Sequence, residues 1–237
     1  MGEFDQYRDT YETLIDDALK FSGADQRFFT QLKANLLNPL FEKLALPGRP
    51  LKALDVGCGH GLIHPLLKGP AGTEIVGVDV AADVIDWART HRPEFTYEAY
   101  DGEHLPFQGG QFDVAFTICV MHHVPPAAWS SFVAEMRRVV RPGGMVVVIE
   151  HNPWNPVTQR IVRTCPIDEN AVLLSAPNLR GLLRSAELEG IQTQFFVFTP
   201  FKNSLARSLD RILQHVPIGA QYMTTARVPA AKQEISR

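Results

Sequence analysis

The chain has 237 residues, of which 45% are hydrophobic and 21% charged, and this length allows one α/β domain with a sizeable core and at most a small appendage. Its net charge of −3 supplies no basic field, so neither a nucleic acid nor an anionic membrane surface is expected as a partner. The three cysteines are widely spaced and form no CxxC pair, which argues against a disulfide framework or a zinc site.

The first 46 residues predict helices that precede the sheet. Their apolar face consists of Phe28, Phe29, Leu32, Leu36 and Leu37. We expect residues 1–46 to lie over the carboxyl ends of the strands as a helical lid, and residues 47–237 to form the main domain.

From residue 51 onward, short apolar runs alternate with helical patterns. Apolar or β-branched runs predict strands at 51–57, 73–80, 95–100, 112–120, 145–150, 191–200 and 221–228. Helical spacing predicts helices at 62–68, 83–91, 127–140, 178–190 and 205–216. This alternation predicts a doubly wound α/β fold with a mostly parallel, seven-stranded Rossmann-like sheet.

Two segments beyond the fifth predicted strand are predicted to form substrate-binding insertions. Residues 151–175 begin with the proline-rich sequence "HNPWNP", and residues 201–220 include an amphipathic helical pattern. No stretch has the length of a transmembrane helix, and the N-terminus lacks the basic-then-apolar layout of a signal peptide. We therefore expect a cytoplasmic protein.

The first predicted strand leads into "LDVGCGHG" (54–61), whose alternating glycines let the backbone come very close to a ligand. A dinucleotide-binding GxGxxG loop would need its third glycine where Leu62 stands. Asp55 lies directly upstream, and its negative charge disfavours a pyrophosphate but suits a ligand that carries an amino group and a cationic centre. Asp79, at the end of the second predicted strand, is placed to accept hydrogen bonds from ribose hydroxyls.

Five motifs in this order resemble those of the class I S-adenosylmethionine-dependent methyltransferases that act on small molecules. They are "LDVGCGHG", "VGVDVA", "YDGEHLPF", "FDVAFTICVMHHV" and "RRVVRPGGMVVVIE". The resemblance covers residues 51–151 in detail and extends in outline to residue 228. It implies that S-adenosylmethionine is the cofactor and S-adenosylhomocysteine its product.

The resemblance also implies which residues contact the cofactor. These are Asp55, Gly57, Cys58, Gly59, Gly61, Asp79, Val80, Asp101, Gly102, Glu103 and Cys119. By this resemblance Asp79 holds the ribose, Asp101 accepts from the adenine amino group, and Cys119 lies near the sulfonium. Cys58 then becomes a small side chain in a turn, and no metal is expected.

Methyl transfer requires alignment of the acceptor and exclusion of water more than it requires a catalytic side chain. A base is needed only when the acceptor atom carries a proton of high pKa, as an alcohol does. His122 and His123 follow the fourth predicted strand, where they are either candidate bases or a structural pair. His151 follows the fifth predicted strand and is the favoured base, since its neighbours Asn152 and Trp154 are typical of a substrate-binding loop.

The predicted substrate contacts are Tyr7, Tyr11, Asn152 and Trp154, although the two tyrosines fit an ordinary amphipathic surface slightly better. The predicted function is methyl transfer to an oxygen of a small-molecule acceptor, with nitrogen or carbon acceptors and a non-catalytic methyltransferase-like subunit as alternatives. A nucleic-acid methyltransferase is disfavoured because "CVMH" replaces an "NPPY"-type tetrapeptide. A nicotinamide-dependent oxidoreductase is disfavoured because the GxGxxG loop is missing. The acceptor and the oligomeric state stay open.

Overall fold

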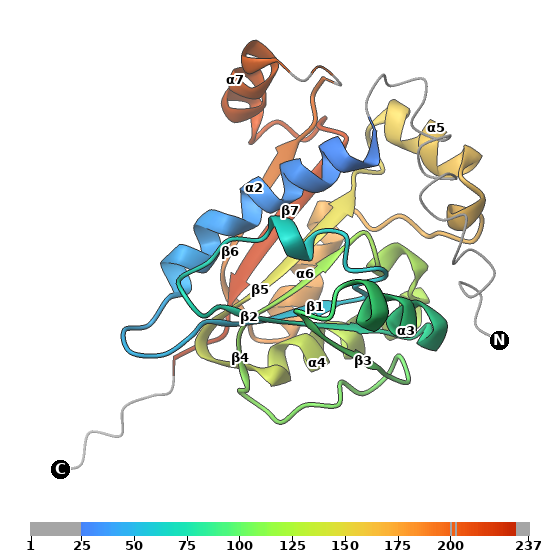
Figure 1. The fold of residues 1–237 in the computed structure, drawn as a ribbon. Helices are drawn as coiled ribbons and strands as arrows, with labels where there is room; N and C mark the ends of the chain where they lie inside the picture. Colours follow the sequence, from blue (N-terminus) through green and yellow to red (C-terminus); the bar gives the residue numbers. More distant parts are fainter. Residues whose placement is uncertain (1–24, 200, 202, 231–237) are drawn as a thin grey trace.

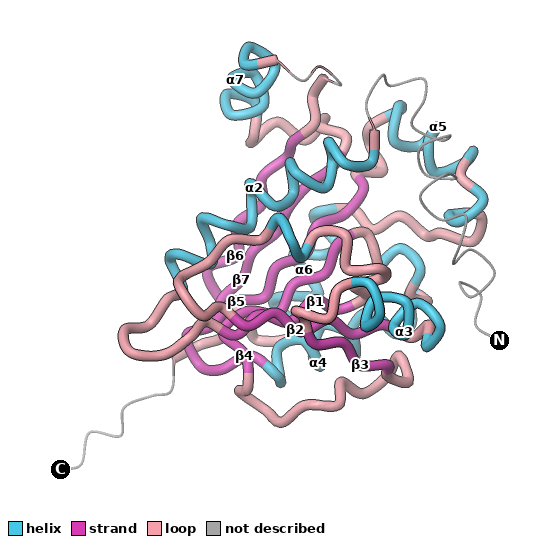
Figure 2. The backbone as a smooth tube through the Cα atoms, in the orientation of Figure 1, coloured by secondary structure: helices cyan, strands magenta, loops and turns pink. Residues whose placement is uncertain are grey.

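A seven-stranded sheet runs through the computed structural model, which describes residues 25–199, 201 and 203–230 (Figures 1 and 2). The strands are β1 (Lys52–Val56), β2 (Glu74–Asp79), β3 (Thr96–Ala99), β4 (Phe112–Ile118), β5 (Val140–His151), β6 (Glu189–Phe196) and β7 (Gln221–Arg227). Their order is β3-β2-β1-β4-β5-β7-β6, and every pairing is parallel except the two that β7 makes. The order reverses between β1 and β4, which confirms the predicted doubly wound, mostly parallel sheet.

Helices and short 3₁₀ turns connect these strands. The helices are α2 (Gln26–Leu44), α3 (Ala82–His91), α4 (Trp129–Val139), α5 (Pro156–Thr164), α6 (Ala176–Ser185) and α7 (Ser204–Leu213). The 3₁₀ turns are η3 (His64–Leu66), η4 (Met121–His123), η5 (Pro126–Ala128) and η6 (Pro166–Asp168).

Strand side chains alternate between the two faces of the sheet and so create two separate cores. On one face, Ala53 of β1 belongs to the same buried cluster as Phe41 of α2. On the other face, Leu54 of β1 is clustered with Met136 of α4 and Leu183 of α6. The helices therefore cover both faces, with α2 on one side and α4 and α6 on the other (Figure 1).

α2 has two roles along its length. Its buried residues, which pack on the sheet, are Ala34, Leu37, Phe41 and Leu44. Closer to its start, Phe29 and Lys33 line a cavity at the carboxyl ends of the strands. The part of the predicted lid that the structure describes is thus also part of the packed core.

The division into a lid (1–46) and a main domain (47–237) stays a prediction. Residues 1–24, with the proposed substrate contacts Tyr7 and Tyr11, lie outside the described residues.

Several element boundaries differ from the sequence-based predictions, and three of these differences have a clear physical reason. The predicted helix at 62–68 is only the turn η3, because Pro65 stands within it and has no amide hydrogen for a continuing helix. β5 begins at Val140 and not at residue 145, since the "RPGG" segment continues the strand with a register shift against β4. α6 ends at Ser185 because Glu187 adopts a positive φ of 56° and turns the chain into β6.

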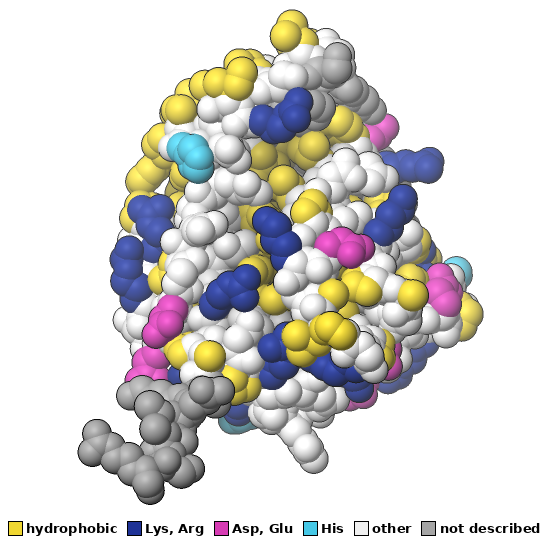
Figure 3. Space-filling view, turned by 90° about the vertical axis from the view of Figure 1, so that its left-hand side faces the viewer, with side chains coloured by type: hydrophobic (Ala, Val, Ile, Leu, Met, Phe, Trp, Pro, Cys, Tyr) yellow, Lys and Arg dark blue, Asp and Glu magenta, His cyan; other side chains and the backbone are white. Residues whose placement is uncertain are grey.

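The 201–220 segment contains α7, whose apolar side chains are largely turned outward. The most exposed large hydrophobic residues of the 201–220 segment are Phe201, Leu205, Ile212 and Ile218. Hydrophobic side chains gather at the upper end of the molecule, where α7 lies (Figures 1 and 3). Over the residues that the structure describes, no helix is both long and apolar enough to cross a membrane.

Candidate active site

A cavity of about 760 Å³ opens at the carboxyl ends of β1, β2, β4 and β5. This is where parallel α/β sheets bind their ligands, beside the reversal of strand order. Ten of the predicted cofactor contacts line it, namely Asp55, Gly57, Cys58, Gly59, Asp79, Val80, Asp101, Gly102, Glu103 and Cys119. Gly61 is not among the lining residues. A Cβ at Gly61 would lie 2.3 Å from the Tyr97 hydroxyl, so this glycine allows close packing behind the loop.

The glycine loop turns tightly against β2 and against Val120, which follows β4. The amides of Gly57 and Cys58 donate to the Val78 carbonyl at 2.8 and 2.9 Å. Gly57 has a φ of +77°, and a Cβ there would lie 2.5 Å from a methyl carbon of Val120. A side chain at Gly57 is thus excluded by both backbone conformation and space, which leaves the loop backbone exposed to the cavity.

Asp55 places a partly unsatisfied carboxylate at the cavity wall. Its Oδ2 lies 3.0 Å from His64 Nε2, and its buried Oδ1 has no hydrogen-bond partner. Burial raises the pKa of Asp55, while the hydrogen bond with His64 opposes that shift. A cationic amino group in the cavity would supply the missing partner, since a buried charge is stable only when it is paired.

Asp79 and Asp101 each hold a loop that lines the cavity. Asp79 accepts from the Gly59 amide through Oδ2 at 2.9 Å and from the Ala81 amide through Oδ1 at 3.0 Å. Burial raises the pKa of Asp79. Asp101 Oδ1 accepts from the amides of Glu103 and His104, and these hydrogen bonds hold the pKa of Asp101 below its usual value.

Cys119 lies at the end of β4 in a strained backbone conformation, with a φ of 56°. Its amide donates to the Ile149 carbonyl at 2.8 Å, and its Sγ lies 3.5 Å from Lys33 Nζ. Burial raises the pKa of the Cys119 thiol, but Lys33 and His151 lower it by more than burial raises it. The resulting pKa is about 7. The contact with Lys33 links α2 to the middle of the cavity.

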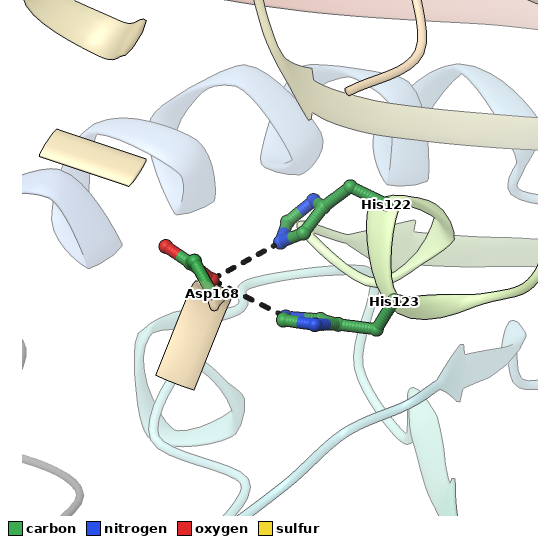
Figure 4. Close-up of side chains that lie close together, drawn as sticks. All are labelled: His122, His123 and Asp168. Atoms are coloured by element: carbon green, nitrogen blue, oxygen red, sulfur yellow. Dashed lines mark ion pairs between the residues drawn. The ribbon is translucent and has the colours of Figure 1, made fainter. Parts of the chain in front are cut away.

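The histidines that follow β4 and the one that ends β5 occupy different positions relative to the cavity. His123 and His151 line it, whereas His122 lies behind the wall with its side chain 1% exposed. His122 Nδ1 lies 2.7 Å from Glu150 Oε2. Asp168 Oδ1 lies 3.5 Å from His122 Nε2 and 3.4 Å from His123 Nε2 (Figure 4).

The pKa values of the two imidazoles in this pair are shifted in opposite directions. Burial lowers the pKa of His122, but Glu150 and Asp168 raise it well above its ordinary value. Burial and the neighbouring His122 lower the pKa of His123 to about 4. The sequence analysis assigned no role to Glu150 or Asp168, because their contacts with His122 join residues that are 28 and 46 positions apart in the chain.

The structure places two of the predicted substrate contacts away from the cavity wall. The Asn152 amide group donates to the carbonyls of Pro217 and Gly219 at 3.0 and 2.8 Å, so it holds two loops together. Trp154 is 52% exposed and does not line the cavity. The predicted insertion 151–175 reaches the cavity through other residues, which are His151, Asn155, Val157, Thr158, Ile161, Cys165, Ile167 and Asp168.

This arrangement agrees with what comparisons with known proteins show. A family described as "Methyltransferase domain" matches residues 54–148. A ubiquinone biosynthesis O-methyltransferase of Mesorhizobium japonicum is 36% identical over 182 residues, which cover 71% of this chain and 72% of the relative. The chain belongs to the S-adenosylmethionine-dependent methyltransferases.

One further relative and one solved structure are also similar to this methyltransferase. An uncharacterized methyltransferase of Synechocystis is 34% identical over 116 residues, 48% of this chain and 53% of the relative. A methyltransferase structure from Archaeoglobus fulgidus aligns with a TM-score of 0.65 at 17% identity, over 86% of this chain and 95% of its own, and shows the shared fold. The chain spans about half to two thirds of the length of three of the curated relatives that it matches.

Family membership confirms the predicted cofactor. The methyltransferase uses S-adenosylmethionine, and the nicotinamide-dependent alternative is set aside.

Proposed function

We propose that this methyltransferase transfers the methyl group of S-adenosylmethionine to a hydroxyl oxygen of a small, largely apolar acceptor. The observation that carries the proposal is the continuity of the cavity. It runs from the glycine loop after β1 to His151 at the end of β5 and to the wall formed by α5 and η6.

The cofactor end of the cavity fits a ligand with a cationic amino acid portion and a nucleoside. The unpartnered Oδ1 of Asp55 suits the ammonium group, and the loop at Gly57–Gly59 exposes its backbone beside it. We assign Asp79 and Val80 to the ribose and the adenine, and the loop at 101–103 to the far edge of the base, because all of them line the cavity. When bound, S-adenosylmethionine supplies a methyl group activated by its sulfonium.

The acceptor end of the cavity is apolar with a few polar groups. Val157, Ile161 and Ile167 form one wall, and the imidazoles of His123 and His151 also line this end. Apolar walls bind the body of a small molecule, and sparse polar groups orient its reactive atom. The name of the M. japonicum relative specifies an O-methyltransferase, which supports oxygen as the acceptor atom.

His151 is the proposed proton acceptor. It stands at the end of β5, where its Nδ1 lies 3.4 Å from Gln221 Nε2. Gln221 therefore lies beside this ring, which lines the cavity. In this role His151 takes the proton from the acceptor hydroxyl, so that the oxygen becomes a better nucleophile. The buried walls exclude the water that would compete for the methyl group.

A methyl-transfer assay with isotopically labelled S-adenosylmethionine tests this proposal. Paired acceptors that differ only in carrying a hydroxyl, an amine or neither would be compared on the purified protein. We expect label to enter the hydroxylated compounds. Transfer only to amines or carbon would replace the oxygen assignment, and cofactor binding without any transfer across a broad library would favour a non-catalytic subunit.

A further inference from the structure

His122, His123 and Asp168 bring three potential metal-ligand atoms together at the wall of the cavity. The two imidazole Nε2 atoms both face one carboxylate oxygen, at 3.5 and 3.4 Å (Figure 4). Charge-assisted hydrogen bonds are usually about 2.7–2.9 Å long, so both contacts are stretched. Two ligands at about 2.0–2.1 Å from a tetrahedral ion lie about 3.3–3.4 Å apart, which is close to both separations.

The three donor atoms also converge as a set. They lie within 4.8 Å of one another. The convergence is built by the fold, because the Val172 amide donates to the His122 carbonyl at 2.8 Å and ties the segment after η6 to η4. Asp168 is itself held by a turn in which its amide donates to the Cys165 carbonyl at 3.0 Å.

Glu150 supports the cluster from behind. Its Oε2 lies 2.7 Å from the Nδ1 atom of His122, which leaves Nε2 to face Asp168. Histidine ligands commonly donate their other ring nitrogen to a carboxylate in this way, since the contact fixes the tautomer and orients the ring. Glu150 is fully buried, and its second oxygen, Oε1, has no hydrogen-bond partner.

We propose that His122, His123 and Asp168 bind one divalent transition-metal ion at the wall of the cavity, with Glu150 orienting His122. Two imidazoles and one carboxylate are donors that suit Zn²⁺ better than Mg²⁺, which prefers oxygen ligands alone. This site departs from the sequence-based expectation of no metal, which considered only the region of Cys58.

The ion would have an open coordination position on the cavity side. His123 and Asp168 line the cavity, while His122 holds the ion from behind. Resting on the proposed function, this position suits the acceptor hydroxyl, whose proton would become easier to remove when its oxygen binds a metal. His151 also lines the cavity, with its ring centroid 5.2 Å from that of His122, so it can receive that proton.

Metal binding is tested without S-adenosylmethionine. Protein stripped with a chelator would be titrated with ZnCl₂ in a calorimeter, and with CoCl₂ while its visible spectrum is recorded. We expect one ion per chain. Asp168→Asn and His123→Gln should each weaken Zn²⁺ binding by about 100-fold or more, and Glu150→Gln by about 10–100-fold.

His91→Ala is the matched control. His91 is exposed on α3, where its Nδ1 lies 2.8 Å from the Trp87 carbonyl, so the variant removes a histidine outside the cluster. Zn²⁺ binding should be unchanged in this variant. Equal binding in the wild type and in both Asp168→Asn and His123→Gln would mean adventitious surface binding and would overturn the proposal.

A parallel titration with S-adenosylhomocysteine separates this proposal from the proposed function. Wild-type protein that binds S-adenosylhomocysteine but neither Zn²⁺ nor Co²⁺ would overturn the metal site alone. Specific Zn²⁺ binding in a protein that transfers no methyl group would support the metal site and contradict the proposed function.

Discussion

The two ends of the cavity are built in different ways. At the end formed by β1 and β2, backbone amides and glycines create the surface, and each carboxylate oxygen of Asp79 accepts a hydrogen bond from a loop amide. At the end formed by β4 and β5, side chains from α2, η4, β5 and η6 converge on Cys119 and His123. The first end should therefore be sensitive to changes in backbone shape, and the second to changes in side-chain chemistry.

The largest effect should come from His151 at the acceptor end. His151→Gln keeps a polar side chain but removes the proposed proton acceptor. We expect kcat for a hydroxylated acceptor to fall by about 10²–10⁴-fold, with the Kd for S-adenosylhomocysteine within about twofold of the wild type. Steady-state kinetics and calorimetry would measure the two quantities. Loss of cofactor affinity with unchanged kcat would contradict the division between the two ends.

A backbone change at the cofactor end should instead weaken the binding of S-adenosylhomocysteine. In Gly57→Ala, the new Cβ would meet Val120 and adopt an unfavourable φ, so the loop must move. We expect the affinity for S-adenosylhomocysteine to fall by about 100-fold or more. Gly48→Ala is the control, because Gly48 also has a positive φ but nothing lies within 4 Å of its Cβ position. Equal losses in both variants would show that strain alone, and not the shape of the loop, decides binding.

A third change tests stability away from both ends. Asp113 is buried at the start of β4, where it accepts hydrogen bonds from Arg49, Arg141 and the Lys52 amide. Asp113→Asn should lower the free energy of unfolding by about 1.5–3 kcal/mol, the usual value of hydrogen bonds to a charged group. Denaturant unfolding would measure it, and cofactor affinity should be unchanged.

The difference in unfolding free energy between the wild type and Asp113→Asn should depend on pH, because the Asp113 carboxyl titrates. Burial raises the pKa of Asp113, but its hydrogen bonds with Arg49, Lys52 and Arg141 hold it below the ordinary value of 3.8. A carboxyl with a lowered folded-state pKa stabilises the protein above its ordinary pKa, and this stabilisation is lost as the pH falls through the folded-state value. The stability gap between the wild type and Asp113→Asn should therefore close below about pH 3.8. A gap that widens in acid would contradict this assignment.

The smallest effect concerns the link between α2 and the cavity. Lys33→Met removes the cation 3.5 Å from Cys119 Sγ, so the pKa of this thiol should rise from about 7. We expect alkylation of Cys119 at pH 7 to slow by about tenfold. Cys58 and Cys165 have raised pKa values and should react little under these conditions. An unchanged rate would mean that Lys33 does not lie beside Cys119 in solution.

The sequence was informative about the cofactor end for a physical reason. The residues of the glycine loop and Asp79 are set by local turns at the ends of strands, and such turns leave a compact sequence pattern. The fold followed from the regular alternation of strands and helices, and even the strand count agrees with the structure. The extent of β5 did not follow, because the strand continues through "RPGG" with a register shift against β4, and pairing between strands distant in the chain leaves no local pattern.

The acceptor end was only partly predictable. His123 and His151 were placed correctly at the ends of two strands, and both line the cavity. The side-chain amide of Asn152 instead donates to the carbonyls of residues 217 and 219 and so joins two loops. A contact between such distant residues cannot be predicted from a local sequence pattern. Asp168 was missed because it reaches the cavity only through the turn that follows α5.

The most direct test of the central claim is a calorimetric titration of the wild type and of Asp79→Ala with S-adenosylhomocysteine, with NADH as the control ligand. We predict one S-adenosylhomocysteine per wild-type chain with micromolar affinity, weaker binding in Asp79→Ala, and no heat from NADH. Absence of binding by the wild type, or unchanged affinity in Asp79→Ala, would contradict the assignment of the glycine loop and Asp79 to the cofactor.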